Sequence, residues 1–444
     1  MQIQLSDHFN YKRLLRYTLP SIAMMIFSSV YVVVDGFFVS NFAGKTAFAA
    51  VNVIFPVIMV LATLGLMFGT GGSAIVAKHF GMGEKEKANE LFSLFVYFTL
   101  TLSAALGLLG IIFIRPISLL LGAEAELLDD CILYGRIVIA ALPFFALQMM
   151  FQCFFAAAEK PKLGFWVTVY SGLTNMVLDA VLVPFLPDGL KLAGAAVATA
   201  LSMVVGGAVP LFYFGRENSS ILRLGRARWD SKAILKACTN GSSEFMSNVA
   251  MNLVAMLYNI QLLNYSGENG VAAYGVMMYV SMIFSAAFIG YSIGSAPIVS
   301  YHFGAENHAE LKNLLRRSLV LTIILSLSMT IAAELMARPL SAIFVGYDPA
   351  LLELTVSGFY IFSLSFMLMG IAIYGSGFFT ALNDGLTSAL ISFLRTLVFQ
   401  VAAVLLLPIV WGIDGIWWSI VAAELMAVIF TLMFLIIKKK KYNY

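Results

Sequence analysis

The segment GGSAIVAKHFG at residues 71–81 returns later in the chain as GSAPIVSYHFG at residues 294–304. The two copies stand 223 residues apart in a chain of 444 residues, which places one copy in each half. Two further pairs share nearly the same spacing: Arg115-Pro116 with Arg338-Pro339, and CFFAAAEK at 153–160 with GFFTALND at 377–384. A nearly constant offset indicates an internal duplication, so we expect two similar halves.

The composition places both halves in a membrane. Hydrophobic residues make up 61% of the chain and charged residues only 11%, whereas an average soluble domain is about half apolar and roughly a quarter charged. So few charges cannot cover a water-exposed surface of this size. The same composition excludes intrinsic disorder, and a net charge of +3 is too small and too diffuse for a nucleic-acid-binding protein.

Apolar segments of membrane-spanning length define the predicted fold. A helix needs about 20 mostly apolar residues to cross a hydrocarbon core about 30 Å thick, whereas barrel strands are shorter and alternate apolar with polar residues. Twelve such runs lie near residues 15–41, 46–77, 90–114, 128–157, 163–186, 193–215, 237–265, 270–301, 311–336, 351–381, 386–408 and 415–437. We predict an all-α polytopic membrane protein with twelve transmembrane helices in two pseudo-symmetric six-helix lobes.

The repeat also predicts the domain organisation. Residues 1–215 are expected to form an N-lobe, residues 216–236 a loop between the lobes, and residues 237–444 a C-lobe. Six helices in each repeat give both halves the same orientation, related by a pseudo-two-fold axis along the membrane normal, as in many secondary transporters. Two lobes that rock around a central site favour transport over a channel or scaffold, although duplication alone does not establish activity.

The basic residues predict the orientation in the membrane. Of 27 Lys and Arg residues, 21 fall on one side, 5 fall on the other side, and Arg395 lies inside a span. Basic loops are retained in the cytoplasm, so both termini and the loop 216–236 are predicted to be cytoplasmic. The first residues show no signal-peptide pattern. We expect a multi-pass protein of a prokaryotic plasma membrane.

Polar residues of three N-lobe spans are predicted to meet about two helical turns below the outer face. Asp35 and Tyr31 lie on the first span, Asp179 and Asn175 on the fifth, and Thr199 on the sixth. Each pair on one span is four residues apart, which places its members on one helix face. A charged residue in a span costs roughly 2.5–3.5 kcal/mol, so this cluster needs a reason.

Two neighbouring carboxyl groups in a low-dielectric place cannot easily both stay ionised. One would hold a proton, or the pair would bind a cation such as Na⁺, so the cluster could couple an ion gradient to conformation. The competing interpretation is a buried hydrogen-bond network that only holds helices together. The repeat equivalents of Asp35 and Asp179 are Tyr258 and Ala403. This asymmetry favours a functional role, because an architectural feature could have been kept in both lobes.

Three more charged residues lie inside C-lobe spans. Arg395 and Glu424 fall near mid-depth on the last two spans, and we predict that they pair in a structural role. Glu244 lies nearer the cytoplasmic end of the seventh span, close to Met246. These two residues are candidates for a substrate site or a second proton site, because Met packs adaptably around varied ligands. A hydrated helix entrance is an equal alternative for Glu244, and simple packing is one for Met246.

The motifs in order resemble the multidrug and toxic compound extrusion (MATE) family over essentially the whole chain. The matching segments are VVVDGFF at 32–38, TNMVLD at 174–179 and GAAVATALS at 194–202. Within the family, GSSEF at 241–245 looks most like the branch around MepA, and the N-lobe acids resemble the DinF branch. The resemblance implies an antiporter that admits H⁺ or Na⁺ while a cationic or amphipathic drug leaves, by alternating access.

The resemblance also implies roles for individual residues. Asp35 matches the acid of the N-lobe cation site, with Tyr31 as its neighbouring aromatic residue. Asp179 and Asn175 match the acid and amide of the fifth span, and Thr199 matches the hydroxyl of the sixth. One departure is notable, because some family members carry an acid in the tenth span and residues 355–382 contain none. That absence makes a C-lobe Na⁺ site doubtful.

Other activities have less support. A flippase for lipid-linked precursors would be expected to have a more cationic central cavity and extra spans, and a passive channel would not need the intramembrane acids. No Walker A, HExxH or GxSxG motif occurs, so neither ATP-driven transport nor an enzyme is expected. We expect no cofactor and no metal beyond Na⁺ at Asp35 and Asp179. The expected partners are membrane lipids and drug molecules, with a monomeric chain. The sequence leaves H⁺ and Na⁺ open and leans towards H⁺.

Overall fold

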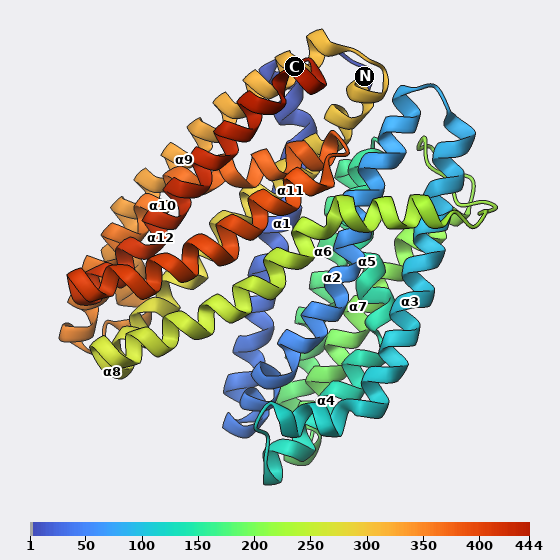
Figure 1. Cartoon of the computed structure of the whole chain (residues 1–444). Coiled ribbons are helices and arrows are strands. Elements are labelled where there is room, and N and C mark those ends of the chain that lie inside the picture. The colour runs from blue at the N-terminus through green and yellow to red at the C-terminus, as the bar shows by residue number, and fades with distance from the viewer. Residues whose placement is uncertain (1–2) are drawn as a thin grey trace.

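The computed structural model describes residues 3–444, which are almost entirely helical and contain no strand (Figure 1). The α-helices are α1 Tyr11–Phe38, α2 Lys45–Gly81, α3 Lys85–Leu120, α4 Ala125–Ala140, α5 Leu142–Ala157, α6 Pro161–Phe185, α7 Lys191–Gly215, α8 Ser231–Gly304, α9 His308–Val345, α10 Pro349–Ala381, α11 Gly385–Phe393 and α12 Phe399–Tyr442. The π-helical turn Val39–Ala43 follows α1. A second π-helical turn, Leu394–Val398, joins α11 to α12. The short 3₁₀ turn Asp188–Leu190 precedes α7.

The twelve predicted spans are present. Within residues 3–444, nine helical stretches are long and apolar enough to cross a membrane, and α4 with α5 forms a further crossing bent by 55°. Two of the nine, α8 with 74 residues and the stretch Gly385–Tyr442 with 58, are too long for one crossing. Each bends back at a glycine, Gly267 (φ 61°, ψ −151°) or Gly412 (φ 59°, ψ −133°), in backbone conformations that essentially only glycine adopts.

Two groups of helices lie at an angle to one another (Figure 1). Helices α1 to α7 form one group and α9 to α12 the other, while α8 runs from the first group to the far tip of the second. The groups approach each other at the end that holds both chain termini and diverge towards the opposite end. The loop before α8 covers residues 216–230, so α8 begins six residues before the predicted edge of the C-lobe at 237. The lobe boundaries themselves stay a prediction.

The groups meet through close backbone contacts at the end that holds the termini. A Cβ atom added at Gly81 of α2 would overlap the carbonyl oxygen of Tyr301, and one added at Gly304 of α8 would overlap that of Lys78. Gly81 and Gly304 are equivalent positions of the repeat, and so are Lys78 and Tyr301. The duplicated segments that define the repeat therefore pack against each other reciprocally.

The same close packing continues deeper in the molecule. A Cβ atom at Gly241 in α8 would overlap the backbone of Met67 in α2, and one at Gly290 would lie 2.6 Å from the backbone oxygen of Ser21 in α1. Small residues permit such close helix approach where lipid supplies no hydrophobic drive for association. Helices α1 and α2 are thus the part of the first group that contacts the second.

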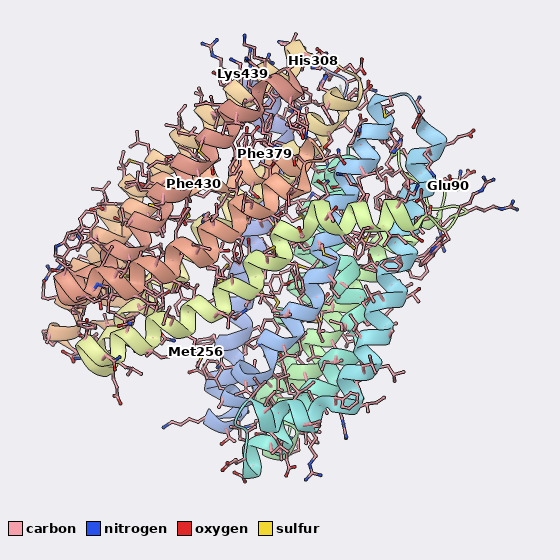
Figure 2. The ribbon with its side chains drawn as sticks, viewed as in Figure 1. Glu90, Met256, His308, Phe379, Phe430 and Lys439 are labelled. Atoms are coloured by element: carbon pink, nitrogen blue, oxygen red, sulfur yellow. The ribbon has the colours of Figure 1, made fainter. Side chains whose placement is uncertain are left out.

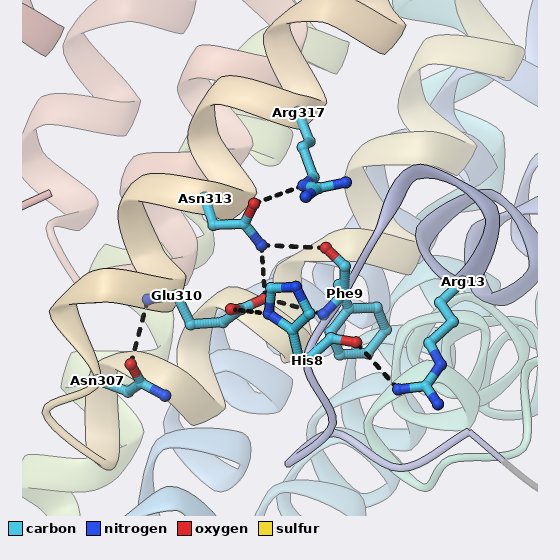
Figure 3. A network of polar contacts seen from close by, with 7 residues as sticks. All are labelled: His8, Phe9, Arg13, Asn307, Glu310, Asn313 and Arg317. Carbon is cyan, nitrogen blue, oxygen red and sulfur yellow. Dashed lines mark hydrogen bonds and ion pairs between the residues drawn. The ribbon is translucent and has the colours of Figure 1, made fainter.

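The N-terminal segment forms a strap across this junction (Figure 3). Leu5 donates its backbone N–H to Glu159 Oε1 at 2.7 Å, between α5 and α6. Phe9 donates its backbone N–H to Glu310 Oε1 on α9 at 2.9 Å, and His8 Nδ1 lies 2.7 Å from Glu310 Oε2. Leu5 and Phe9 are fully buried. One short segment is therefore bonded to both groups at the same end.

The outer surface fits a membrane environment. Large apolar side chains such as Leu120, Phe185 and Ile343 are exposed, as expected where lipid covers a helix bundle. Charged side chains gather at the end of the termini, where Lys439 and His308 lie (Figure 2). Together with the lengths of the helices, this distribution describes a multi-pass membrane protein.

Gly304→Ala should lower the melting temperature of the purified protein in detergent. The added methyl group must push α8 away from the backbone of α2, and overpacking of this kind costs about 1–3 kcal/mol. Gly275→Ala on the same helix is the matched control, because a Cβ atom there meets nothing within 4 Å. Equal melting temperatures for the two variants would contradict the close-packed junction.

Candidate functional site

The predicted N-lobe cluster is assembled around Asp35. Asn175 Nδ2 on α6 donates to Asp35 Oδ1 at 3.2 Å, and Thr199 Oγ1 on α7 donates to the same oxygen at 3.3 Å. Tyr31 lies close enough to Asp35 for electrostatic interaction. Asp179 is fully buried, whereas Asp35 is partly exposed. Three helices therefore bring their polar side chains together, and Asp35 is the carboxyl group that is accessible from outside the cluster.

Asp179 lies near enough to Asp35 for the two carboxyl groups to interact electrostatically. Ionised carboxylates only accept hydrogen bonds, so a bond between Asp35 and Asp179 requires a proton on one of them. No other donor among residues 3–444 reaches either oxygen of Asp179, and Asn175 Oδ1 is also unpartnered. Buried polar atoms without partners are costly and call for an explanation. The oxygen set fits one shared proton, and equally offers ligands to a small cation.

The local sequence explains how α1 and α6 come so close. A Cβ atom at Gly172, three residues before Asn175, would lie 2.6 Å from the ring of Phe27 and 3.1 Å from that of Tyr31. Only a residue without a side chain permits this approach. Directly after α1, the π-helical turn Val39–Ala43 ends the helix beyond Asp35, and such turns are frequent beside functional sites.

Two residues of the cluster were not predicted from the sequence. The hydroxyl of Tyr134 on α4 lies near Asp35 and Asp179, is fully buried, and has no hydrogen-bond partner among the described residues. Gln148 on α5 lies near Tyr31 and donates to Ser171 Oγ at 3.3 Å. An amide inside the apolar run ALQMMF was a signal that could have identified Gln148. Tyr134 carried no such signal, because tyrosine is common in these spans.

Glu244 lies apart from the cluster. It lines a small cavity between helices of the two groups, together with Thr70, Ser73, Cys153, Ser292, Gly377 and Thr380. Met246 is not part of that lining, so the two residues considered together from the sequence face different surroundings. A second proton site at Glu244 stays a prediction. The lining of the cavity gives no support to a shared site of Glu244 and Met246.

Arg395 and Glu424 are in contact, as the sequence predicted. Arg395 Nε lies 3.0 and 2.9 Å from the two carboxylate oxygens of Glu424, and Nη2 lies 2.9 Å from Oε1. The pair lines a cleft of about 390 Å³. Most of the lining comes from α8, with smaller contributions from α12, α10 and the π-helical turn that contains Arg395, and α2 adds Phe55, Pro56 and Met59. The contact between the two residues is confirmed, and the structural role of the pair stays a prediction.

Proteins of known function resemble this chain over most of its length. Multidrug export protein MepA of Staphylococcus haemolyticus (strain JCSC1435) is 24% identical over 416 residues, which cover 93% of this chain and 90% of that protein. MepA of Staphylococcus aureus (strain MRSA252) is 21% identical over 415 residues, covering 93% and 91%.

Solved structures share the whole fold. An outward-facing multidrug resistance MATE family transporter of the MOP superfamily superposes with a TM-score of 0.93 at 22% identity, covering 100% of this chain and 98% of that one. A crystal structure of MATE in complex with MaL6 gives a TM-score of 0.92 at 21% identity, covering 98% of both chains.

The sequence profile of the MatE family matches residues 20–181 and again residues 245–405, once in each half of the duplicated chain. The two matches together include well over half of the sequence. The resemblance seen in the motifs is thus confirmed: the chain belongs to the MatE family, the multidrug and toxic compound extrusion transporters.

Proposed function

We propose that this protein is a secondary active multidrug exporter in which protons enter through the Asp35–Asp179 pair while amphipathic, mostly cationic compounds leave. The observation that carries the proposal is the fully buried carboxyl group of Asp179, which has no hydrogen-bond partner among residues 3–444 and lies near the partly exposed carboxyl group of Asp35. A proton shared by the two groups would keep two negative charges from being held side by side in a low-dielectric place. A group that gains or loses that proton changes the charge buried between α1 and α6. Since α1 also packs against α8, a change at the pair acts on a helix that contacts both lobes.

The arrangement of the lobes supports alternating access. The groups are joined by the glycine contacts and the N-terminal strap at the end of the termini and diverge at the other end (Figure 1). With both termini in the cytoplasm of a prokaryotic cell, this state faces outward. Protonation from outside would then be possible through the partly exposed Asp35. A passive channel would have no need of a junction closed at one end.

The cleft supports export of amphipathic molecules. Its lining is largely apolar, with Met59, Met251, Met278 and Met369 among its residues, and flexible Met side chains adapt to different ligands. The relatives carry the name multidrug export protein, which is consistent with a broad apolar site. A lipid-linked diphosphate would need a clearly cationic cavity, whereas the charges of Arg395 and Glu424 cancel.

Asp35→Asn should abolish gradient-driven efflux of ethidium from cells or vesicles. The amide cannot bind and release a proton, so the exchange step is lost, whereas the size of the side chain is preserved. Asp414→Asn is the matched control, because Asp414 is an exposed carboxylate beyond the Gly412 bend and should keep wild-type efflux. Undiminished efflux by Asp35→Asn would exclude the pair as the coupling site.

The coupling ion can be identified in proteoliposomes that contain the purified protein and a fluorescent cation. A pH gradient alone should drive transport, because a shared proton satisfies the carboxyl pair without further ligands. A Na⁺ gradient at equal pH on both sides should have no effect. Transport driven by Na⁺ and not by pH would overturn the proton as the coupling ion and keep the exporter.

A further inference from the structure

The C-lobe cleft has one charged group that a ligand can reach. Arg395 and Glu424 are the only formally charged residues in its lining. The side chain of Arg395 is 18% exposed and that of Glu424 only 3%. A molecule in the cleft therefore meets the guanidinium group first, although the pair as a whole is neutral.

The guanidinium group retains donors for a ligand. Glu424 engages Nε and Nη2, Glu244 interacts with the guanidinium group only electrostatically, and no described residue is hydrogen-bonded to Nη1. Arg395 presents up to five N–H donors in a rigid fork that matches a carboxylate. Glu424 thus fixes the orientation of the group and leaves one edge of the fork for a second carboxylate.

Arg395 lies at an irregular point of the helix backbone. It lies within the π-helical turn Leu394–Val398, which interrupts the span between α11 and α12. A π-helical turn inserts one extra residue into a helix and is frequent at functional sites. The other π-helical turn of the chain follows Asp35, so within residues 3–444 both interruptions accompany an intramembrane charge.

A neighbouring amide adds a second donor. Tyr258 donates its hydroxyl to Gln400 Oε1 at 2.7 Å, which orients the NH₂ group of Gln400 away from Tyr258. Gln400, Tyr258 and Arg395 all line the cleft. Tyr258 is the repeat equivalent of Asp35. The N-lobe therefore has an acid at this position, whereas the C-lobe has a tyrosine that orients the amide of Gln400. The two lobes therefore offer opposite chemistry to a ligand.

We propose that Arg395 is a binding site for the carboxylate of zwitterionic amphipathic substrates, with Glu424 as its positioning residue and Gln400 as a second donor. The inference rests on the proposed export function and names one substrate class for it. The apolar body of such a substrate occupies the cleft among the Met side chains. Its carboxylate completes a Glu–Arg–carboxylate row that keeps all three charges hydrogen-bonded.

Two dyes that differ by one group provide the test. Rhodamine 110 carries a free carboxylate beside its cationic ring system, and rhodamine 123 is its methyl ester and purely cationic. Binding of each dye to the full-length protein in detergent is measured by fluorescence polarisation, and export of each is measured in proteoliposomes. The quantity compared is the ratio of the two dissociation constants.

The variants for this test are chosen so that the protein still folds. Removing one member of a buried pair leaves an uncompensated charge, whereas replacing both is well tolerated, so the pair is changed as a unit. Arg395→Gln with Glu424→Gln should weaken binding of rhodamine 110 by about tenfold and leave rhodamine 123 unchanged. Arg395→Glu with Glu424→Arg places the acid at the accessible position and should reverse the preference towards rhodamine 123.

The matched control is Arg338→Gln with Glu353→Gln, an exposed pair with a contact of 2.7 Å outside the cleft. It should keep the wild-type ratio. An unchanged ratio in both cleft variants, or wild-type protein that binds rhodamine 123 but not rhodamine 110, would overturn the carboxylate site and leave the exporter standing. Failure of the wild-type protein to export rhodamine 123 would overturn the export function itself.

Discussion

The packing of glycine against backbone at the junction of the lobes is the constraint on which the rest of the structure depends. Gly81 and Gly304 allow α2 and α8 to cross at a distance that any side chain would prevent. In lipid, apolar side chains gain little from leaving the solvent, so such close van der Waals contact supplies the association. Because the contact is reciprocal, the junction holds the lobes at one end while their other ends diverge. The N-terminal strap adds hydrogen bonds across the same place.

The duplication supplies a symmetric frame and the intramembrane charges make it asymmetric. The N-lobe contains the acidic pair Asp35 and Asp179, and the C-lobe contains Arg395 held by Glu424. The residue at the repeat position equivalent to Asp35 is Tyr258, which donates a hydrogen bond to Gln400. A transporter with one acidic lobe and one lobe that offers hydrogen-bond donors separates the ion site from part of the substrate site. With separate sites, the ion and the substrate can be coupled without competing for the same residue.

The fold and part of the site could be predicted because both follow from local physical requirements. Apolar length predicts the twelve spans, and the cost of a buried charge draws attention to Asp35, Asp179 and the Arg395–Glu424 contact. The remaining features depend on tertiary packing. Tyr134 lies near the cluster because α4 packs against α2 and α7, and no periodicity predicts the π-helical turns. The burial of Leu5 could not be predicted from a polar N-terminal segment.

Proton-coupled export by this protein requires that a proton held by the Asp35–Asp179 pair is exchanged for substrate. The most direct measurement is the number of protons released when ethidium binds to the purified protein in a weakly buffered solution that contains a pH indicator. We expect release of about one proton per protein molecule, because one shared proton satisfies the pair, and no release from the variant with both Asp35→Asn and Asp179→Asn. Equal proton release by the wild-type protein and that variant would contradict proton exchange at the pair.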